Sequence, residues 1–230
     1  MQIRPLESID EFDAMIELQR RIWGYSDLEA ESRGILTVAS RFAGQLLGAF
    51  IGQELVGFAL AFVGLETSSL HSHRVGVHPT NQNAGVGFAL KLAQREYALK
   101  QGYQFIHWTF DPLQPRNAHF NLHKLGGYAR RIFPNLYGTG TSPLHGGLPT
   151  DRLLVEWDLH SERVLSVLSR RREVRDENVT RIPLVTDNSS PGIRNQQRLR
   201  NRLNDAFCAG LTVTDFETHG SSGDYILERV

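Results

Sequence analysis

The stretch that most restricts how this chain can fold is His71–Ala98, HSHRVGVHPTNQNAGVGFALKLAQREYA. It begins with an alternating segment that predicts a β-strand, because side chains two residues apart point to the same face of a strand. Four side chains are therefore expected on one face: His71, His73, Val75 and Val77. Pro79 ends the strand because it has no N–H to donate. The loop Gln82–Gly87 then opens a long helical pattern.

This glycine loop lies at a helix N-terminus, which is a favourable place for an anion. Four backbone N–H groups lack partners there, and the helix dipole presents about half a positive charge. A phosphate is the natural ligand of such a site, and Gly85 and Gly87 would let it approach the main chain. Each N–H bond to a charged oxygen contributes roughly 1.5 to 3 kcal/mol. Three or four such bonds could hold a pyrophosphate without a lysine, and the loop has none.

Two familiar phosphate-binding motifs are absent from the chain. It has no G-x-x-x-x-G-K-[ST] string, and no G-x-G-x-x-G directly after the first strand with an acid further on. The order strand, V-x-V-x-P, Q-x-x-G-x-G, helix resembles the acyl-CoA loop of the GNAT superfamily of N-acetyltransferases, whose pattern is [QR]-x-x-G-x-[GA] after the fourth strand. The resemblance implies these residues for binding acetyl-CoA (coenzyme A): Val75, Val77, Gln82, Asn83, Ala84, Gly85, Val86 and Gly87. A glycine turn that only starts a helix, or a site for another nucleotide, remains an alternative.

The order of predicted elements to residue 160 is β-α-(α)-β-β-β-α-β-α-β-β, as in the GNAT fold. We therefore expect an α/β (α+β) protein with a mixed, mostly antiparallel sheet flanked by helices. The clearest elements are a helix over 9–23, capped by S-x-x-E at Ser8–Glu11, a hairpin of strands 45–51 and 55–65, and strands 105–110 and 151–159. In the helix after the loop, Lys91, Gln94 and Arg95 are expected to point outward.

Residues 161–230 lie beyond this pattern, and we expect an α/β extension packed on an acetyltransferase domain of residues 1–160. A strand over 182–186, a helix ending at Gly210 and a final hairpin are predicted in it. The arginine face of that helix is either a solvated surface or a recognition surface for an acidic acceptor: Arg194, Arg198 and Arg202. The strings SHRVGVHP, WTFDPLQPRNAHFNLHKLG and LPTDRLLVEWDL resemble a bacterial subgroup of predicted acetyltransferases.

The composition limits which binding partners and which compartment are expected. Lys+Arg and Asp+Glu both number 25, so the formal net charge is zero and neither nucleic acid nor a membrane surface is expected as a partner. One cysteine, Cys208, suits a reducing compartment. The first residues lack a basic start followed by an apolar run, which predicts a cytoplasmic protein. The expected partner is a small-molecule or peptide amine, and a homodimer is allowed.

Transfer of an acetyl group to an amine needs a base and a donor for the acyl oxygen. The resemblance implies that the backbone N–H of Val75 is this donor. It also places His71 where the family often has a catalytic glutamate, and His73 lies nearer the thioester. Histidine is available in its neutral form near pH 7, so we predict that His73 or His71 is the base. The alternative is that both histidines are structural.

A second region, from Asn117 to Gly126, also resembles the superfamily. Asn117 either caps a short helix or contacts the pantetheine, and Lys124–Gly126 fits the motif K-x-G. The family's tyrosine two residues before the lysine, which protonates the leaving thiolate, is replaced here by Leu122. Weak substitutes for this acid are Tyr128 and Tyr137. His119 and His123 could form a zinc site with His71 or His73, but H-x-x-x-H without an intervening glutamate is a weak signal, and we expect no metal.

The predicted function is acetyl-CoA-dependent transfer of an acetyl group to a primary amine by direct attack in a ternary complex. The alternative is a non-catalytic acyl-CoA-binding module, because the usual tyrosine and glutamate are missing. The sequence leaves the acceptor open.

Overall fold

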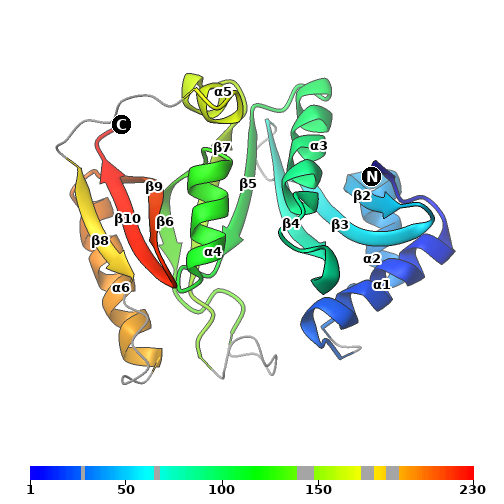
Figure 1. Ribbon diagram of the computed structural model, residues 1–230, viewed down its shortest axis with the longest axis horizontal. Helices are drawn as coiled ribbons and strands as arrows, with labels where there is room; N and C mark the ends of the chain where they lie inside the picture. Colours follow the sequence, from blue (N-terminus) through cyan, green and yellow to red (C-terminus); the bar gives the residue numbers. More distant parts are fainter. Residues whose placement is uncertain (27–28, 65–67, 139–147, 172–178, 185–191) are drawn as a thin grey trace. The chain divides into compact units, whose positions relative to one another are not determined.

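A computed structural model describes residues 1–26, 29–64, 68–138, 148–171, 179–184 and 192–230. The chain forms two compact units (Figure 1). Unit 1 contains Met1–His107, and unit 2 contains the described residues from Trp108 to Val230. The boundary falls within the strand β5 (Phe105–Phe110).

Unit 1 is a sheet with helices on both faces. Its elements before β5 are β1 (Gln2–Pro5), α1 (Ile9–Trp23), α2 (Arg33–Val38), the π-helical turn η1 (Ala39–Ala43), β2 (Gly44–Ile51), β3 (Glu54–Val63), β4 (Ser69–Val77), the 3-10 turn η2 (Pro79–Asn81) and α3 (Val86–Lys100). The strands lie in the order β1-β2-β3-β4-β5. The first four pair antiparallel, whereas β4 and β5 pair in parallel through Ser69–His71 and Phe105–His107.

The two faces of this sheet bury separate clusters. Helices α1 and α2 pack on one face, with a core that includes Leu6, Phe12, Met15, Leu36 and Phe58. Helix α3 covers the other face, with a core that includes Leu47, Ala49, Val56, Val86 and Leu90. Figure 1 shows α3 and the α1–α2 pair on opposite sides of these strands. A strand such as β3 is therefore covered on both faces, which explains its almost wholly apolar sequence.

Local signals placed the first elements correctly. Helix α1 has the predicted bounds, because Ser8 Oγ accepts a hydrogen bond from the Glu11 N–H (3.2 Å) and the Glu11 carboxylate accepts one from the Ser8 N–H (3.1 Å). This reciprocal capping satisfies two helix-end donors. The predicted hairpin is confirmed as β2 and β3, joined at Gly52, whose φ of 60° suits a residue without a Cβ.

The predicted face of β4 is wrong, because the strand contains a β-bulge. Strand β3 pairs Leu60 with Arg74 but Ala61 with Ser72, so His73 is an extra residue in β4. An extra residue interrupts the alternation of side chains. The two valines, Val75 and Val77, accordingly pack against the α3 cluster. His73 and Arg74 instead both contact Glu31, which lies between α1 and α2.

The outward orientation predicted for α3 residues is also wrong at two positions. Lys91 and Gln94 are only 2 % and 0 % exposed. The Lys91 Nζ donates to Ser72 Oγ (3.0 Å) and to Gln94 Oε1 (3.4 Å), and Ser72 Oγ donates to the same Gln94 oxygen (2.9 Å). Burial lowers the pKa of Lys91 well below its usual value. A polar residue of β4 thus gives these side chains partners inside the sheet–helix interface.

Unit 2 carries the rest of the chain. After Trp108–Phe110 its elements are α4 (Pro115–Ala118), the π-helical turn η3 (His119–Lys124), β6 (Tyr128–Phe133), β7 (Arg152–Asp158), α5 (Glu162–Leu168), β8 (Thr180–Leu184), α6 (Gly192–Cys208), β9 (Thr212–His219) and β10 (Ser222–Glu228). The last five strands follow the order β7-β6-β9-β10-β8 and pair antiparallel. The predicted mixed, mostly antiparallel sheet flanked by helices is confirmed.

The C-terminal segment is part of the sheet of unit 2. Strand β9 pairs with β6 at Val213 and Ala129, and Tyr225 of β10 donates through its hydroxyl to the carbonyl of Pro112 (2.7 Å). The domain boundary at residue 160 stays a prediction. The predicted final hairpin is confirmed as β9 and β10. None of the helices within the described ranges is long and apolar enough to cross a membrane.

Two further predictions need correction or lie outside the description. Asn117 is not a helix cap, because α4 begins at Pro115 after the cap residue Gln114. The strand expected over 182–186 runs over Thr180–Leu184, and residues 185–186 are outside the described residues. Residues 134–150, which are rich in glycine, proline and threonine, are predicted to form a long loop, and residues 139–147 of it are also outside the described residues.

The buried Lys91 predicts a pH-dependent stability. Its folded pKa is lowered, so the unfolded chain takes up a proton as the pH falls below about 10.4, whereas the folded chain takes it up only at lower pH. Stability should therefore rise with pH. We expect Lys91→Met to raise the free energy of unfolding at pH 7 by about 1–4 kcal/mol, and by less at pH 9.5.

Denaturant unfolding at both pH values measures this difference. Lys100→Met, at an exposed position near the end of the same helix, is the matched control and should change little. A destabilised Lys91→Met at pH 7 would contradict the argument.

Candidate functional site

The β-bulge in β4 gathers polar side chains on the α1–α2 face of unit 1. His73 Nε2 lies 2.9 Å from Glu31 Oε1, and Arg74 Nε lies 2.8 Å from the same oxygen. The hydrogen bond from His73 lowers the pKa of Glu31 and the charge of Arg74 adds to this, against the opposing effect of burial. Glu31 is therefore a carboxylate near neutral pH. Arg74 Nε also lies 3.4 Å from His73 Nε2, but its distance to Glu31 Oε1 is shorter. A carboxylate only accepts hydrogen bonds, so the 2.9 Å contact with Glu31 places the proton of the neutral His73 ring on Nε2 and leaves Nδ1 as a base.

Arg74 fastens the segment after α1 to the strand. Its guanidinium carbon lies 5.6 Å from the ring centroid of Trp23 and 5.0 Å from that of Tyr25. Its Nη2 donates to the carbonyl of Glu29 (3.3 Å). These cation–π and hydrogen-bond contacts place Glu31 beside His73.

His71 is held in its neutral form. Its ring centroid lies 6.4 Å from that of His73, and it pairs with His107 across the β4–β5 ladder. Burial lowers the pKa of His71 to about 4, with further lowering by the nearby His73, His107 and Lys91. Such a low pKa makes His71 a weak base near neutral pH.

The other edge of β4 presents main-chain groups. The N–H of His78 donates to the Val56 carbonyl (2.8 Å), which identifies a hydrogen-bonded pair between β4 and β3. Because such pairs alternate along an antiparallel ladder, the N–H groups of Val75 and Val77 point away from β3. The backbone donor predicted at Val75 thus lies on the edge away from that partner.

The glycine loop has an open, uncapped geometry. Residues Gln82–Gly85 are exposed, and α3 begins at Val86 with no side-chain hydrogen bond at its N-cap. Gly85 has a φ of +83°, and a Cβ built there would meet no atom within 4 Å. At Gly87 a Cβ would meet only Val77, at 3.7 Å. The loop therefore offers helix N-terminal N–H groups and free space, which fit the diphosphate of a nucleotide cofactor.

The remaining predicted residues lie in unit 2. Asn117 is exposed within α4, and Leu122, at the place of the expected tyrosine, is fully buried. Tyr128 donates to Glu156 Oε2 (3.5 Å), and burial raises its pKa together with the charge of Glu156. The hydroxyl of Tyr137 lies 3.1 Å from Thr109 Oγ1.

The two helical histidines contact each other and the C-terminal hairpin. His119 and His123 stack with ring centroids 4.5 Å apart, and His123 Nδ1 lies 3.1 Å from Asp215 Oδ1. Within the described parts of the chain, no group of three or more His, Cys, Asp or Glu side chains could hold a metal ion. Asp215 belongs to β9, so this contact joins η3 to the C-terminal hairpin inside unit 2.

Sequence reasoning missed Glu31, Arg74 and His107. Nothing in the sequence near Glu31 signals a role, because its partners are 42 and 43 residues away. The bulge also hid Arg74, which simple alternation placed on the face opposite His73. The segment between α1 and α2 brings Glu31 to the bulge of β4, and the pairing of β4 with β5 brings His107 beside His71.

Comparison with known proteins identifies the family to which the chain is similar. Residues 12–126 match the acetyltransferase (GNAT) family. Among solved structures, the ribosomal-protein-S18-alanine N-acetyltransferase from Escherichia coli is 16% identical, with a TM-score of 0.57 over 70% of this chain and 94% of that one. The aminoglycoside 6'-N-acetyltransferase from Enterococcus faecium is 16% identical, with a TM-score of 0.54 over 70% and 99%.

An aminoglycoside 6'-N-acetyltransferase complexed with coenzyme A is likewise 16% identical, with a TM-score of 0.53 over 70% of this chain and 99% of that one. At these identities the likeness shows the shared fold. No curated protein matches the sequence.

The lowered pKa of His71 can be measured directly. Its folded pKa of about 4 lies below the unfolded value of about 6.5, so stability is retained above pH 6.5 and lost as the pH falls toward 4. The imidazole NMR signal of His71 is identified as the one missing from the spectrum of His71→Gln. We expect this signal to titrate near pH 4. The variant should also lose less stability than the wild type between pH 6.5 and 4.5. A midpoint near 6.5 would show that the ring is not held neutral.

Proposed function

Because the chain belongs to the acetyltransferase (GNAT) family, we propose that it transfers an acetyl group to a primary amine by direct attack in a ternary complex. Acyl-CoA-dependent acetyl transfer is the general chemistry of this family, and its cofactor is acetyl-CoA. The observation that carries the finer proposal is the His73–Glu31 pair at the bulge of β4. It provides a base on the strand that leads into the glycine loop.

The cofactor, when bound, supplies a thioester-activated acetyl group. Residues Gln82–Gly87 would hold its diphosphate through the uncapped N–H groups at the start of α3. The N–H groups of Val75 and Val77, which face away from β3, are available for the pantetheine and the acyl oxygen. Asn117 remains a proposed pantetheine contact.

His73 would act as the general base. Glu31 accepts from Nε2 and so leaves Nδ1 to remove a proton from the acceptor ammonium, directly or through water. Glu31 is a positioning residue in this scheme, because it acts through the ring of His73. A general base contributes roughly 10² to 10⁴ to a rate.

The leaving thiolate also needs a proton. Leu122 cannot supply one, and it is buried. Tyr128 and Tyr137 remain the proposed sources of this proton.

The charge of the side chains around His73 limits which kind of acceptor amine is favoured. Glu31 is compensated by Arg74, and His71 is neutral, so the described side chains around His73 offer no excess negative charge. A polycation such as an aminoglycoside would gain little there. We therefore propose an acceptor with a single amine, such as a small metabolite or the N-terminus of a peptide.

We expect Gly85→Glu to weaken coenzyme A binding at least about 100-fold, because a carboxylate would occupy and repel the phosphate site. Isothermal titration calorimetry with coenzyme A measures the change. Gly102→Glu is a matched control, since Gly102 has a φ of +79° and equal free space at the other end of the helix. Equal affinity of the two variants would contradict the loop assignment.

The catalytic proposal is tested by release of free thiol from acetyl-CoA with an amine panel that includes an N-terminal-alanine peptide and an aminoglycoside. We expect His73→Ala to lower kcat at least about tenfold with KM for acetyl-CoA unchanged. Glu31→Gln should lower kcat less, and Glu31→Asp should restore part of the loss.

The exposed His160→Gln controls for loss of a histidine. A wild-type rate for His73→Ala would make that histidine structural. Binding of coenzyme A without thiol release for any amine would instead identify a non-catalytic binding module.

A further inference from the structure

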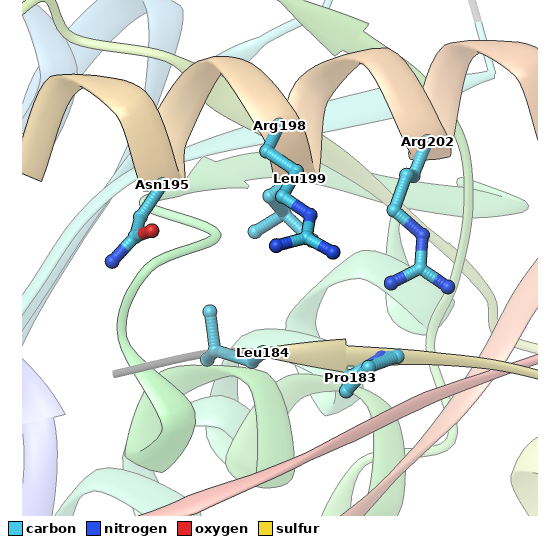
Figure 2. A pocket seen from close by; sticks show the side chains of 6 residues that line it. All are labelled: Pro183, Leu184, Asn195, Arg198, Leu199 and Arg202. Carbon is cyan, nitrogen blue, oxygen red and sulfur yellow. The ribbon is translucent and has the colours of Figure 1, made fainter. Parts of the chain in front are cut away.

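A groove runs between α6 and β8 in unit 2. Figure 2 shows three polar side chains, Asn195, Arg198 and Arg202, directed from α6 toward β8. Pro183 and Leu184 of β8 lie opposite them, and Leu199 lies behind the arginines. The groove has about 270 Å³ of free space, which includes open solvent. One wall is thus cationic, and the opposite wall presents Pro183 to solvent, because Leu184 is only 1 % exposed.

Within the described residues, the two arginines of this groove lack the ion-pair partners that other arginines of the same unit have. Arg200, on the same helix, pairs with Asp151 at 3.1 Å, and Arg181 of β8 pairs with Glu217 at 2.5 Å. Across the described parts of the chain, neither Arg198 nor Arg202 has a hydrogen-bond or ion-pair partner. Both guanidinium groups are therefore available to an external anion.

Charge is concentrated on this helix. Helix α6 carries four arginines against one acid: Arg194, Arg198, Arg200, Arg202 and Asp205. The chain as a whole has zero net charge, so this surface is a local excess rather than a general property. Like charges one turn apart repel each other, and a bound anion would remove that repulsion.

The strand wall excludes one mode of binding. Strand β8 is at the end of the sheet order, where an added strand could pair. Pro183 has no N–H to donate and interrupts such pairing. Recognition in this groove must therefore rely on side chains.

We propose that this groove binds an acidic polypeptide segment with carboxylates on alternate residues. Arg198 and Arg202 are separated by about 6.0 Å along the helix axis. Alternate side chains of an extended peptide are separated by about 6.6–6.8 Å and point to the same side. Two carboxylates of such a segment meet two guanidinium groups in the forked geometry that arginine favours.

The residues between the carboxylates point the other way, toward the exposed Pro183. An acidic peptide with apolar intervening residues fits both walls, whereas a free phosphate would use only one. This site stands on unit 2 alone and does not depend on the proposed acetyl transfer.

The test is fluorescence polarisation with the full chain and a labelled pentapeptide of alternating glutamate and leucine. We expect saturable binding that weakens as salt is raised, because the pairs are partly exposed. Arg198→Glu together with Arg202→Glu should weaken it at least about tenfold. Arg229→Glu, at an exposed position away from the groove, should leave it unchanged, and circular dichroism checks that each variant is folded.

Two further experiments test whether binding requires the peptide carboxylates and the arginine guanidinium groups. A peptide with glutamine in place of glutamate should not bind, and Arg198→Lys with Arg202→Lys should bind more weakly than the wild type, because lysine lacks the fork. Unchanged binding by the double glutamate variant overturns the proposal. Calorimetric binding of inorganic phosphate without binding of the acidic peptide would also overturn it, in favour of a small-anion site.

Discussion

The extra residue in β4 is the constraint on which the candidate site depends. Without the bulge at His73, Val75 and Val77 would lie on the same face as the histidines, and the α3 cluster would lose them. With it, the strand buries valines under α3 and turns His73 and Arg74 together toward Glu31. One inserted residue therefore serves the core on one face and the polar cluster on the other.

The same unit shows how buried ionisable groups are accommodated. Lys91 is placed against Ser72 and Gln94, and burial lowers its pKa. Glu31 keeps its charge because His73 and Arg74 both contact it. Both groups have polar partners, since an unpaired charge in an apolar interior is costly.

Among its described residues, unit 2 contains both paired and unpaired arginines, and the unpaired ones support the proposed binding groove. Its internal contacts pair Arg200 with Asp151 and place His123 beside Asp215, which ties β9 to η3. Arg198 and Arg202 instead face a groove beside β8. The C-terminal segment therefore completes the sheet of this unit and also presents a cationic groove to solvent.

Sequence by itself determined the local elements, because capping at Ser8, glycines at turns and period-two or helical patterns act over a few residues. It also indicated the glycine loop, whose function requires only neighbours in the chain. It failed at the faces of β4 and at Lys91, and it did not find Glu31. Those features depend on which residue of β3 lies opposite which residue of β4, and on what a strand offers a helix across the interface. Only tertiary pairing decides them, because a shift of one residue exchanges the two faces of a strand.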